Sequence, residues 1–193
     1  MICVLLALSF VPTYGARAEG YAHNPWSVSL YFGPSSQKYF GAVIQSGRLQ
    51  PSGGMLGVAA NGRLLYLGYG ISLAAEGQIT GYFFGHKNAS VAFGLGFQVN
   101  APFGIEHTAF SVYDGPSYAF DPPYTAIYYK SLVVPSYRIK FLNYVSMEYA
   151  VELPNSQHWD GVFRFYHRSG AWGLYNKNDD DGIAVGLGVR YRF

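Results

Sequence analysis

The chain has 193 residues, the length of a single domain, but its composition is unusual for a soluble protein. Charged residues make up only 12 %, about half the usual share, whereas glycine (24), tyrosine (18) and phenylalanine (14) are abundant. A formal net charge of +2 without a basic cluster argues against a nucleic-acid partner. No apolar run reaches the roughly 18 residues that a membrane helix needs. The composition therefore favours a sheet with one apolar face over a soluble enzyme or a helical membrane protein.

Residues 1–18 have the pattern of a secretory signal peptide. A short apolar stretch leads to the small-residue site Ala16-Arg17-Ala18, which predicts Glu19 as the first mature residue. The alternative is a short buried strand or helix. The single cysteine, Cys3, lies in this segment. The mature domain, residues 19–193, is therefore expected to contain no disulfide and no thiol-based metal or catalytic site.

Eight segments of the mature domain alternate between apolar residues and small or polar residues, which is the pattern of β-strands. In chain order, the predicted strands are 26–33, 54–60, 71–80, 90–99, 106–113, 141–151, 158–168 and 182–193. Most of them approach the roughly 9–11 residues that a tilted membrane strand requires. The last strand alternates most regularly and ends the chain on Phe193, a pattern typical of bacterial outer-membrane barrels.

Turn-forming residues separate these strands. Compact turns are expected at 61–62, 85–88, 102–104 and 154–156, and longer connections at 34–53, 114–137 and 170–181. An even number of strands with both termini on the periplasmic side places the long connections at the outer side.

Two barrels fit the alternation: a soluble barrel of the lipocalin type, with apolar faces inward, and a membrane barrel, with apolar faces outward. The apolar faces carry bulky Phe, Tyr, Val and Leu, too large for the narrow interior of eight strands. The opposite faces combine small residues with Glu76, Glu148, Arg138, Arg164, Arg190 and Arg192. We therefore predict an all-β fold, an eight-stranded antiparallel transmembrane β-barrel of the bacterial outer membrane. Its lumen is expected to be packed and ion-paired, with Glu76 and Glu148 bound to arginines rather than forming a catalytic pair.

One strand combines an apolar face with residues able to do chemistry. Phe163 and Phe165 share their side of the strand with His167 and Ser169. Alternate residues lie about 6.5–7 Å apart along a strand face. Because a histidine facing hydrocarbon is costly, this pair belongs either at the headgroup level, as a polar rim, or to a functional site.

A serine hydroxyl becomes a good nucleophile when a neighbouring base accepts its proton. Here His167 would be the base for Ser169, and the backbone N–H groups of Gly170 and Ala171 would stabilise an oxyanion. A hydrolase on the outside of a barrel meets its substrate within the membrane, which implies a lipid ester.

At these residues the chain resembles a known family. The run His167-Arg168-Ser169-Gly170-Ala171, with the strand that follows, is similar to the PagL-type lipid A 3-O-deacylases, chiefly over residues 142–193. The resemblance implies an outer-membrane barrel with a His-x-Ser pair and an acidic residue on its lipid-facing surface, acting on lipid A of lipopolysaccharide. It implies no metal or cofactor.

The chain departs from the family at two positions. Gly170 stands where the family has the asparagine implicated in the oxyanion hole, and Ala184 follows Gly182-Ile183 where the family has its glutamate. Asp181 is our first choice for a replacement acid because it shares the outward parity of Ile183, with Asp179 and Asp180 as alternatives.

Two functions therefore remain open. The first is a lipid A esterase with His167, Ser169 and Asp181 as catalytic residues. The second is a non-catalytic barrel that contributes to the envelope or binds a partner through the tyrosine-rich connection around residues 121–129.

Overall fold

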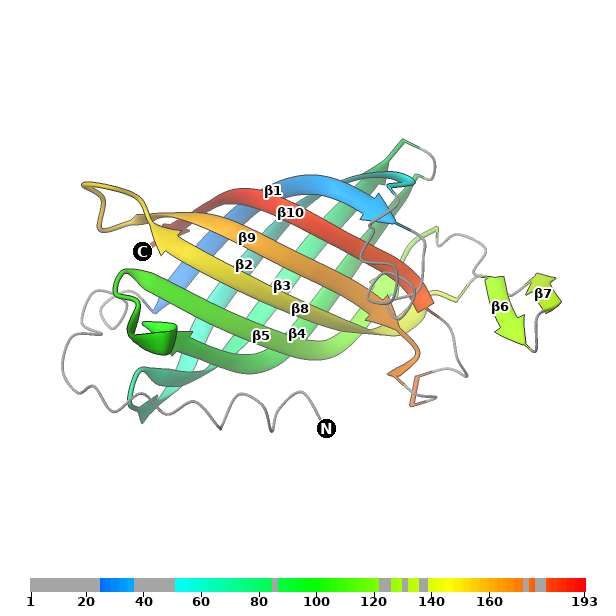
Figure 1. The fold of residues 1–193 in the computed structure, drawn as a ribbon. Helices are drawn as coiled ribbons and strands as arrows, with labels where there is room; N and C mark the ends of the chain where they lie inside the picture. The colour runs from blue at the N-terminus through cyan, green and yellow to red at the C-terminus, as the bar shows by residue number, and fades with distance from the viewer. Residues whose placement is uncertain are drawn as a thin grey trace.

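A computed structural model describes residues 25–36, 51–84, 87–121, 126–129, 132–135, 139–171, 174–175 and 180–193. Eight strands close an antiparallel barrel in the order β1-β10-β9-β8-β5-β4-β3-β2 (Figure 1). They are β1 (Trp26–Ser36), β2 (Gly53–Gly68), β3 (Ile71–Phe83), β4 (Asn88–Asn100), β5 (Thr108–Ala119), β8 (Phe141–Glu152), β9 (Trp159–Ser169) and β10 (Asp180–Arg192). Strands β6 (Ala126–Tyr129) and β7 (Leu132–Pro135) pair only with each other, and a short 3-10 turn, η1 (Pro102–Gly104), follows β4. The predicted eight-stranded antiparallel barrel is confirmed, whereas residues 1–18 and Arg138 lie outside the described residues.

The two ends of the barrel differ. Trp26 begins β1 and Phe193 follows β10, and the Phe193 N–H donates to the Trp26 carbonyl (3.0 Å), so both chain ends meet at what we call the terminal end. The connections at this end cover only 69–70, 101–107 and 153–158. The opposite end, called the loop end, carries the connections 37–52, 84–87, 120–140 and 170–179. This asymmetry is typical of outer-membrane barrels.

The turn expected at 61–62 is wrong, because β2 continues to Gly68 and the hairpin turns at Tyr69 and Gly70. Asn61 points into the barrel, where its amide donates to Glu76 (2.7 Å). Tyr69 and Gly70 have φ angles of 52° and 77°, the left-handed pair that a two-residue hairpin requires. A buried partner at Asn61 therefore overrides the local turn preference of Asn-Gly.

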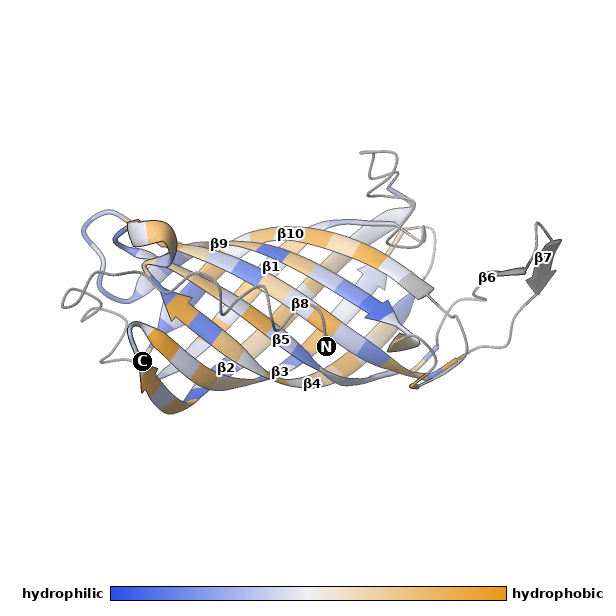
Figure 2. Ribbon diagram, turned by 60° about the horizontal axis from the view of Figure 1, so that its bottom comes forward, coloured by the Kyte–Doolittle hydropathy of each residue, from blue (hydrophilic) through white to orange (hydrophobic). Residues whose placement is uncertain are grey.

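The side chains sort by polarity between the two surfaces of the barrel. Large apolar residues face outward and stay exposed, as in Phe32 (64 %) and Leu187 (62 %). Figure 2 shows hydrophobic and hydrophilic residues alternating along the strands. A lipocalin-type barrel would have the reverse arrangement, so the prediction that the apolar faces point outward is confirmed. No helix among the described residues is long and apolar enough to cross a membrane.

Ion pairs run along the lumen. Arg164 binds Glu76 and Glu148, the latter at 2.9 Å. Arg190 joins Glu148 (3.0 Å) to Asp160 (2.7 Å). Arg192 then joins Asp160 (3.1 Å) to Glu152 (3.3 Å) at the terminal end. Because consecutive partners come from β3, β8, β9 and β10, this ladder of charges ties together strands on different sides of the barrel.

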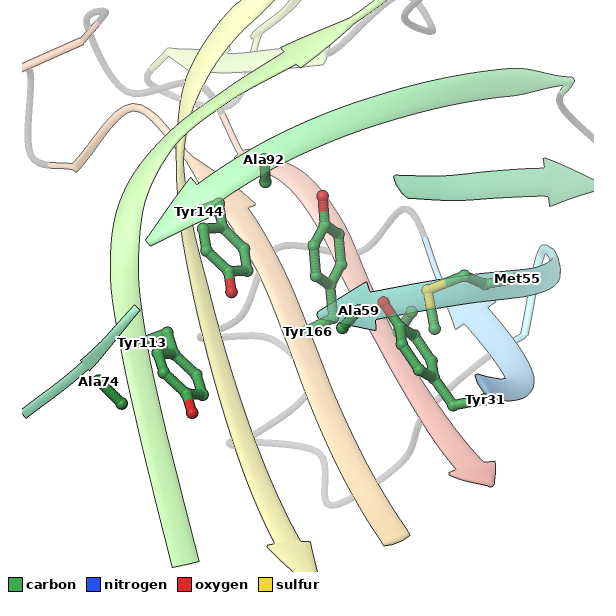
Figure 3. Close-up of a cluster of buried hydrophobic side chains, with 9 residues drawn as sticks. Tyr31, Met55, Ala59, Ala74, Ala92, Tyr113, Tyr144 and Tyr166 are labelled. Carbon is green, nitrogen blue, oxygen red and sulfur yellow. The ribbon is translucent and has the colours of Figure 1, made fainter. Parts of the chain in front are cut away.

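Tyrosines and small residues fill the rest of the lumen. The buried cluster comprises Tyr31, Met55, Ala59, Ala74, Ala92, Tyr113, Tyr144, Tyr166 and Ala184 (Figure 3). The Tyr31 hydroxyl donates to Gln78 (2.8 Å), and the Arg164 guanidinium lies 4.8 Å from the Tyr31 ring centroid. A Cβ at Gly57 would lie 2.3 Å from that ring, so only glycine fits beside it. The lumen is thus packed around its charges, as the sequence predicts.

We expect Glu148→Ala to destabilise the barrel by about 3–5 kcal/mol, because it removes the carboxylate that Arg164 and Arg190 share in the interior. Urea unfolding in detergent micelles, followed by tryptophan fluorescence, measures the change. Glu106→Ala, an exposed acid in the connection between β4 and β5, is the control and should change stability by less than about 0.5 kcal/mol. Equal effects of the two variants would contradict a structural role for the ladder.

Candidate functional site

The candidate site lies on the outer face of β9 near the loop end. His167 and Ser169 point outward and are half-buried, whereas the alternate residues Tyr166 and Arg168 are buried in the lumen. The outer face therefore changes within one strand from apolar at Phe163 to polar at its last two outward positions. This is the level at which a membrane barrel leaves the hydrocarbon, and polar groups there can meet a lipid headgroup.

The backbone of β10 orients the His167 ring. Nδ1 lies 3.0 Å from the Gly182 carbonyl oxygen. Because a carbonyl only accepts hydrogen bonds, Nδ1 must carry the proton, and Nε2 is then the basic nitrogen of the neutral ring. The carbonyl thereby fixes the tautomer, a task that an acidic residue performs in a Ser-His-acid triad. Ala184 faces the lumen, so an acidic side chain at this position could not orient His167 on the same backbone.

A bulge in β10 changes the expected position of Asp181. Asp180 is in register with Ser169 and Gly182 with Arg168, so one residue is inserted between these pairs. Gly182 has a φ of 101°, a left-handed conformation that glycine adopts easily and that is common at bulges. The prediction that Asp181 points outward like Ile183 assumed unbroken alternation along the strand. With the bulge, the backbone places Asp180 across from Ser169.

The chain after Ser169 supplies a backbone donor. The Ala171 N–H donates to Ser169 Oγ at 3.4 Å, and Ala171 has a left-handed φ of 48°. The Gly170 carbonyl accepts from the Tyr175 N–H at 3.1 Å, which closes the turn. Within the described residues, the Ser169 hydroxyl contacts the Ala171 amide and makes no hydrogen bond to the His167 ring. The two side chains are thus neighbours that a substrate must bring into line, which is common in unliganded sites.

Strand register brings two further polar residues, which the sequence analysis missed, to the same surface. Asn143 of β8 lies directly opposite Ser169, and Asp114 of β5 lies one row below, in line with Val145 and His167. The Asn143 Nδ2 donates to Asp114 Oδ1 at 2.7 Å. The available sequence signal was a polar residue at an outward strand position between Phe141 and Val145.

Aromatic residues border the site on the loop side. Tyr175, from the connection after β9, packs against Phe141 of β8 with ring centroids 5.4 Å apart. Tyr118 of β5, in register with Phe141, packs edge-on against Phe120 at 5.5 Å. Rings of this kind mark the interfacial level of a membrane barrel. The site therefore lies between the apolar outward residues Phe163 and Phe165 of β9 and this aromatic border.

Comparisons with known proteins give limited similarity. No family model matches the chain, and no curated protein matches it. Among solved structures, the outer membrane protein Ail of Yersinia pestis, determined in a phospholipid bilayer nanodisc, is 11 % identical with a TM-score of 0.47, covering 89 % of this chain and 100 % of its own. The outer membrane protein OprG of Pseudomonas aeruginosa is 9 % identical with a TM-score of 0.45, covering 88 % of this chain and 96 % of its own. Likeness of this degree transfers no residue role or activity.

Proposed function

We propose that this chain is a bacterial outer-membrane barrel with a serine–histidine esterase on its outer face, acting on an acyl ester of lipid A. The observation that carries the proposal is the outward pair of His167 and Ser169, with Nδ1 of the histidine held by the Gly182 carbonyl. Both side chains face outward, so neither belongs to the ion pairs and tyrosine packing of the lumen.

Membrane residence is supported by the chemistry of the outer surface. A broad exposed apolar face on a folded protein indicates a surface that another apolar phase covers. At the terminal end, Trp159 packs on Tyr191 (4.9 Å between centroids), and Tyr191 packs on Phe193 (5.2 Å). Together with the aromatic border near Phe141, these rings form the two girdles that flank the apolar band of a membrane barrel.

The reaction follows from the positions of the groups. His167 Nε2 accepts the proton as Ser169 Oγ attacks the ester carbonyl, and the N–H groups of Ala171 and Gly170 stabilise the resulting oxyanion. The intermediate collapses, the carbon–oxygen bond to the alcohol breaks, and the alcohol leaves with the proton from His167. Water then attacks the acyl-serine by the same route and releases the fatty acid.

The position of the site favours a lipid substrate. The outward residues Met147, Phe165 and Val185 lie side by side on β8, β9 and β10, toward the middle of the barrel from Ser169. An acyl chain lying on this wall would place its ester near the polar rim. An outer-leaflet lipid such as lipid A, whose ester bonds lie between sugar and acyl chain, has this arrangement, and the resemblance to lipid A deacylases points to the same substrate.

A non-catalytic barrel is the second candidate. It is favoured by the partner of His167 Nδ1, which is a backbone carbonyl where the resembled family uses a carboxylate. In this alternative, His167 and Ser169 are a polar rim that only matches the headgroup region. Any binding of a partner would then involve the connections at the loop end.

We expect Leu187→Arg to destabilise the folded protein in phospholipid vesicles by about 2–4 kcal/mol, because Leu187 is outward near the middle of β10. Urea unfolding in vesicles measures the difference, with Leu187→Met as the matched control. An arginine variant as stable as the methionine variant would mean that this face does not contact hydrocarbon.

We expect cells that express the wild-type chain to contain lipid A lacking one acyl chain, because an ester is cleaved. His167→Ala and Ser169→Ala should leave lipid A intact at equal amounts of folded barrel. Mass spectrometry of extracted lipid A reads out the result, and Ser52→Ala, an exposed serine at the same end, should behave as wild type.

Intact lipid A with all four proteins, each correctly inserted, would contradict the esterase and favour the non-catalytic barrel. Deacylation that persists in Ser169→Ala would contradict the assigned nucleophile.

A further inference from the structure

We propose that the side-chain amide of Asn143 is an oxyanion donor of this site and that Asp114 positions it. The inference rests on the proposed esterase function. It assigns a role to a polar pair on the outer face, a buried asparagine and an exposed aspartate, that neither the strand pattern nor the barrel requires.

The register places Asn143 beside the nucleophile. Asn143 and Ser169 are direct cross-strand partners between β8 and β9. Such partners have Cβ atoms about 4.5–5.5 Å apart. At this spacing the Asn143 amide can reach the carbonyl group of an ester whose carbon bonds to Ser169 Oγ. Ala171 donates from the chain beyond β9, whereas Asn143 approaches from β8. A developing oxyanion would therefore lie between a backbone donor and a side-chain donor.

The pair with Asp114 fixes the orientation of the amide. Because a carboxylate accepts hydrogen bonds and cannot donate them, the nitrogen of Asn143 must face Asp114, as the 2.7 Å contact shows. One N–H is used in this bond. The amide carries a second N–H, for which the described residues give no protein acceptor. The structure thus presents an oriented donor that is available to a ligand.

Burial makes the Asn143 amide costly without a function. Asn143 is only 7 % exposed although it lies on the outward face, where its strand neighbours Phe141 and Val145 are apolar. Burying an amide with part of its hydrogen-bonding capacity unused costs free energy. Asp114 lies two strands from Ser169, about 10 Å by strand spacing, so its charge opposes an oxyanion weakly, whereas the amide donates to it directly.

In the reaction, Asn143 forms and breaks no covalent bond. Its N–H donates to the carbonyl oxygen more strongly as negative charge develops there, and it keeps its proton throughout. Asp114 contacts no substrate and acts only by holding the amide, so it is a positioning residue.

The test uses hydrolysis of a p-nitrophenyl ester of a medium-chain fatty acid by the full chain folded in detergent micelles. We expect Asn143→Ala to lower kcat by about 10²–10³-fold with little change in KM, as for loss of one oxyanion donor. Asn143→Asp, which keeps the shape but has no N–H, should lose as much. Asp114→Ala should lose less, because the amide remains. Leu95→Ala, an outward residue of β4 in register with Asp114, is the control.

The outcomes separate this inference from the proposed function. If Ser169→Ala is inactive but both Asn143 variants keep kcat within threefold of wild type, the donor role is overturned and the esterase stands. A rise in KM alone also overturns it, since that indicates binding rather than oxyanion stabilisation. If wild type hydrolyses no more ester than Ser169→Ala, the proposed function fails and the inference fails with it. Asn143→Asp keeps the test decisive if Asn143→Ala does not fold.

Discussion

The salt bridges of Arg164 are the interaction on which the arrangement of the barrel depends. Its guanidinium joins Glu76 of β3 to Glu148 of β8, so strands from opposite parts of the sheet are held across the lumen. These charges are fully buried and are tolerable only because each has partners inside the barrel. Once the charged faces turn inward, alternation turns every apolar face outward. The same contacts pack the lumen, which is consistent with a candidate site on the outer surface.

The candidate site follows from this division. The outer face is apolar along most of each strand, and the described polar side chains Asp114, Asn143, His167 and Ser169 gather on β5, β8 and β9 toward the loop end. In the proposed esterase, His167 and Ser169 would contribute the reactive groups; the Gly182 carbonyl orients the His167 ring, and Asp114 orients the Asn143 amide. A serine hydrolase needs a nucleophile, an oriented base and donors for an oxyanion, and each has a candidate here. The site differs from a full triad in using a carbonyl to hold the histidine.

The sequence predicts the periodic features of this molecule well. Eight strands, their inward and outward faces and the arginine partners of Glu76 and Glu148 all follow from a period of two. Features that depend on register or on tertiary partners were missed. The Asn61-Gly62 turn failed because Asn61 has buried partners, and the bulge before Gly182 shifted the alternation at Asp181. Asn143 and Asp114 were overlooked because only strand pairing places Asn143 opposite Ser169 and Asp114 in the row of His167.

The central claim is that Ser169 is a nucleophile activated by His167. An alkyl fluorophosphonate tests it directly, because an activated serine displaces fluoride and keeps the phosphonyl group. Peptide mass spectrometry of the barrel folded in phospholipid vesicles should locate one adduct on Ser169, formed at least about 100-fold more slowly in His167→Ala. Absence of an adduct on Ser169, or labelling at the same rate without His167, would contradict the account.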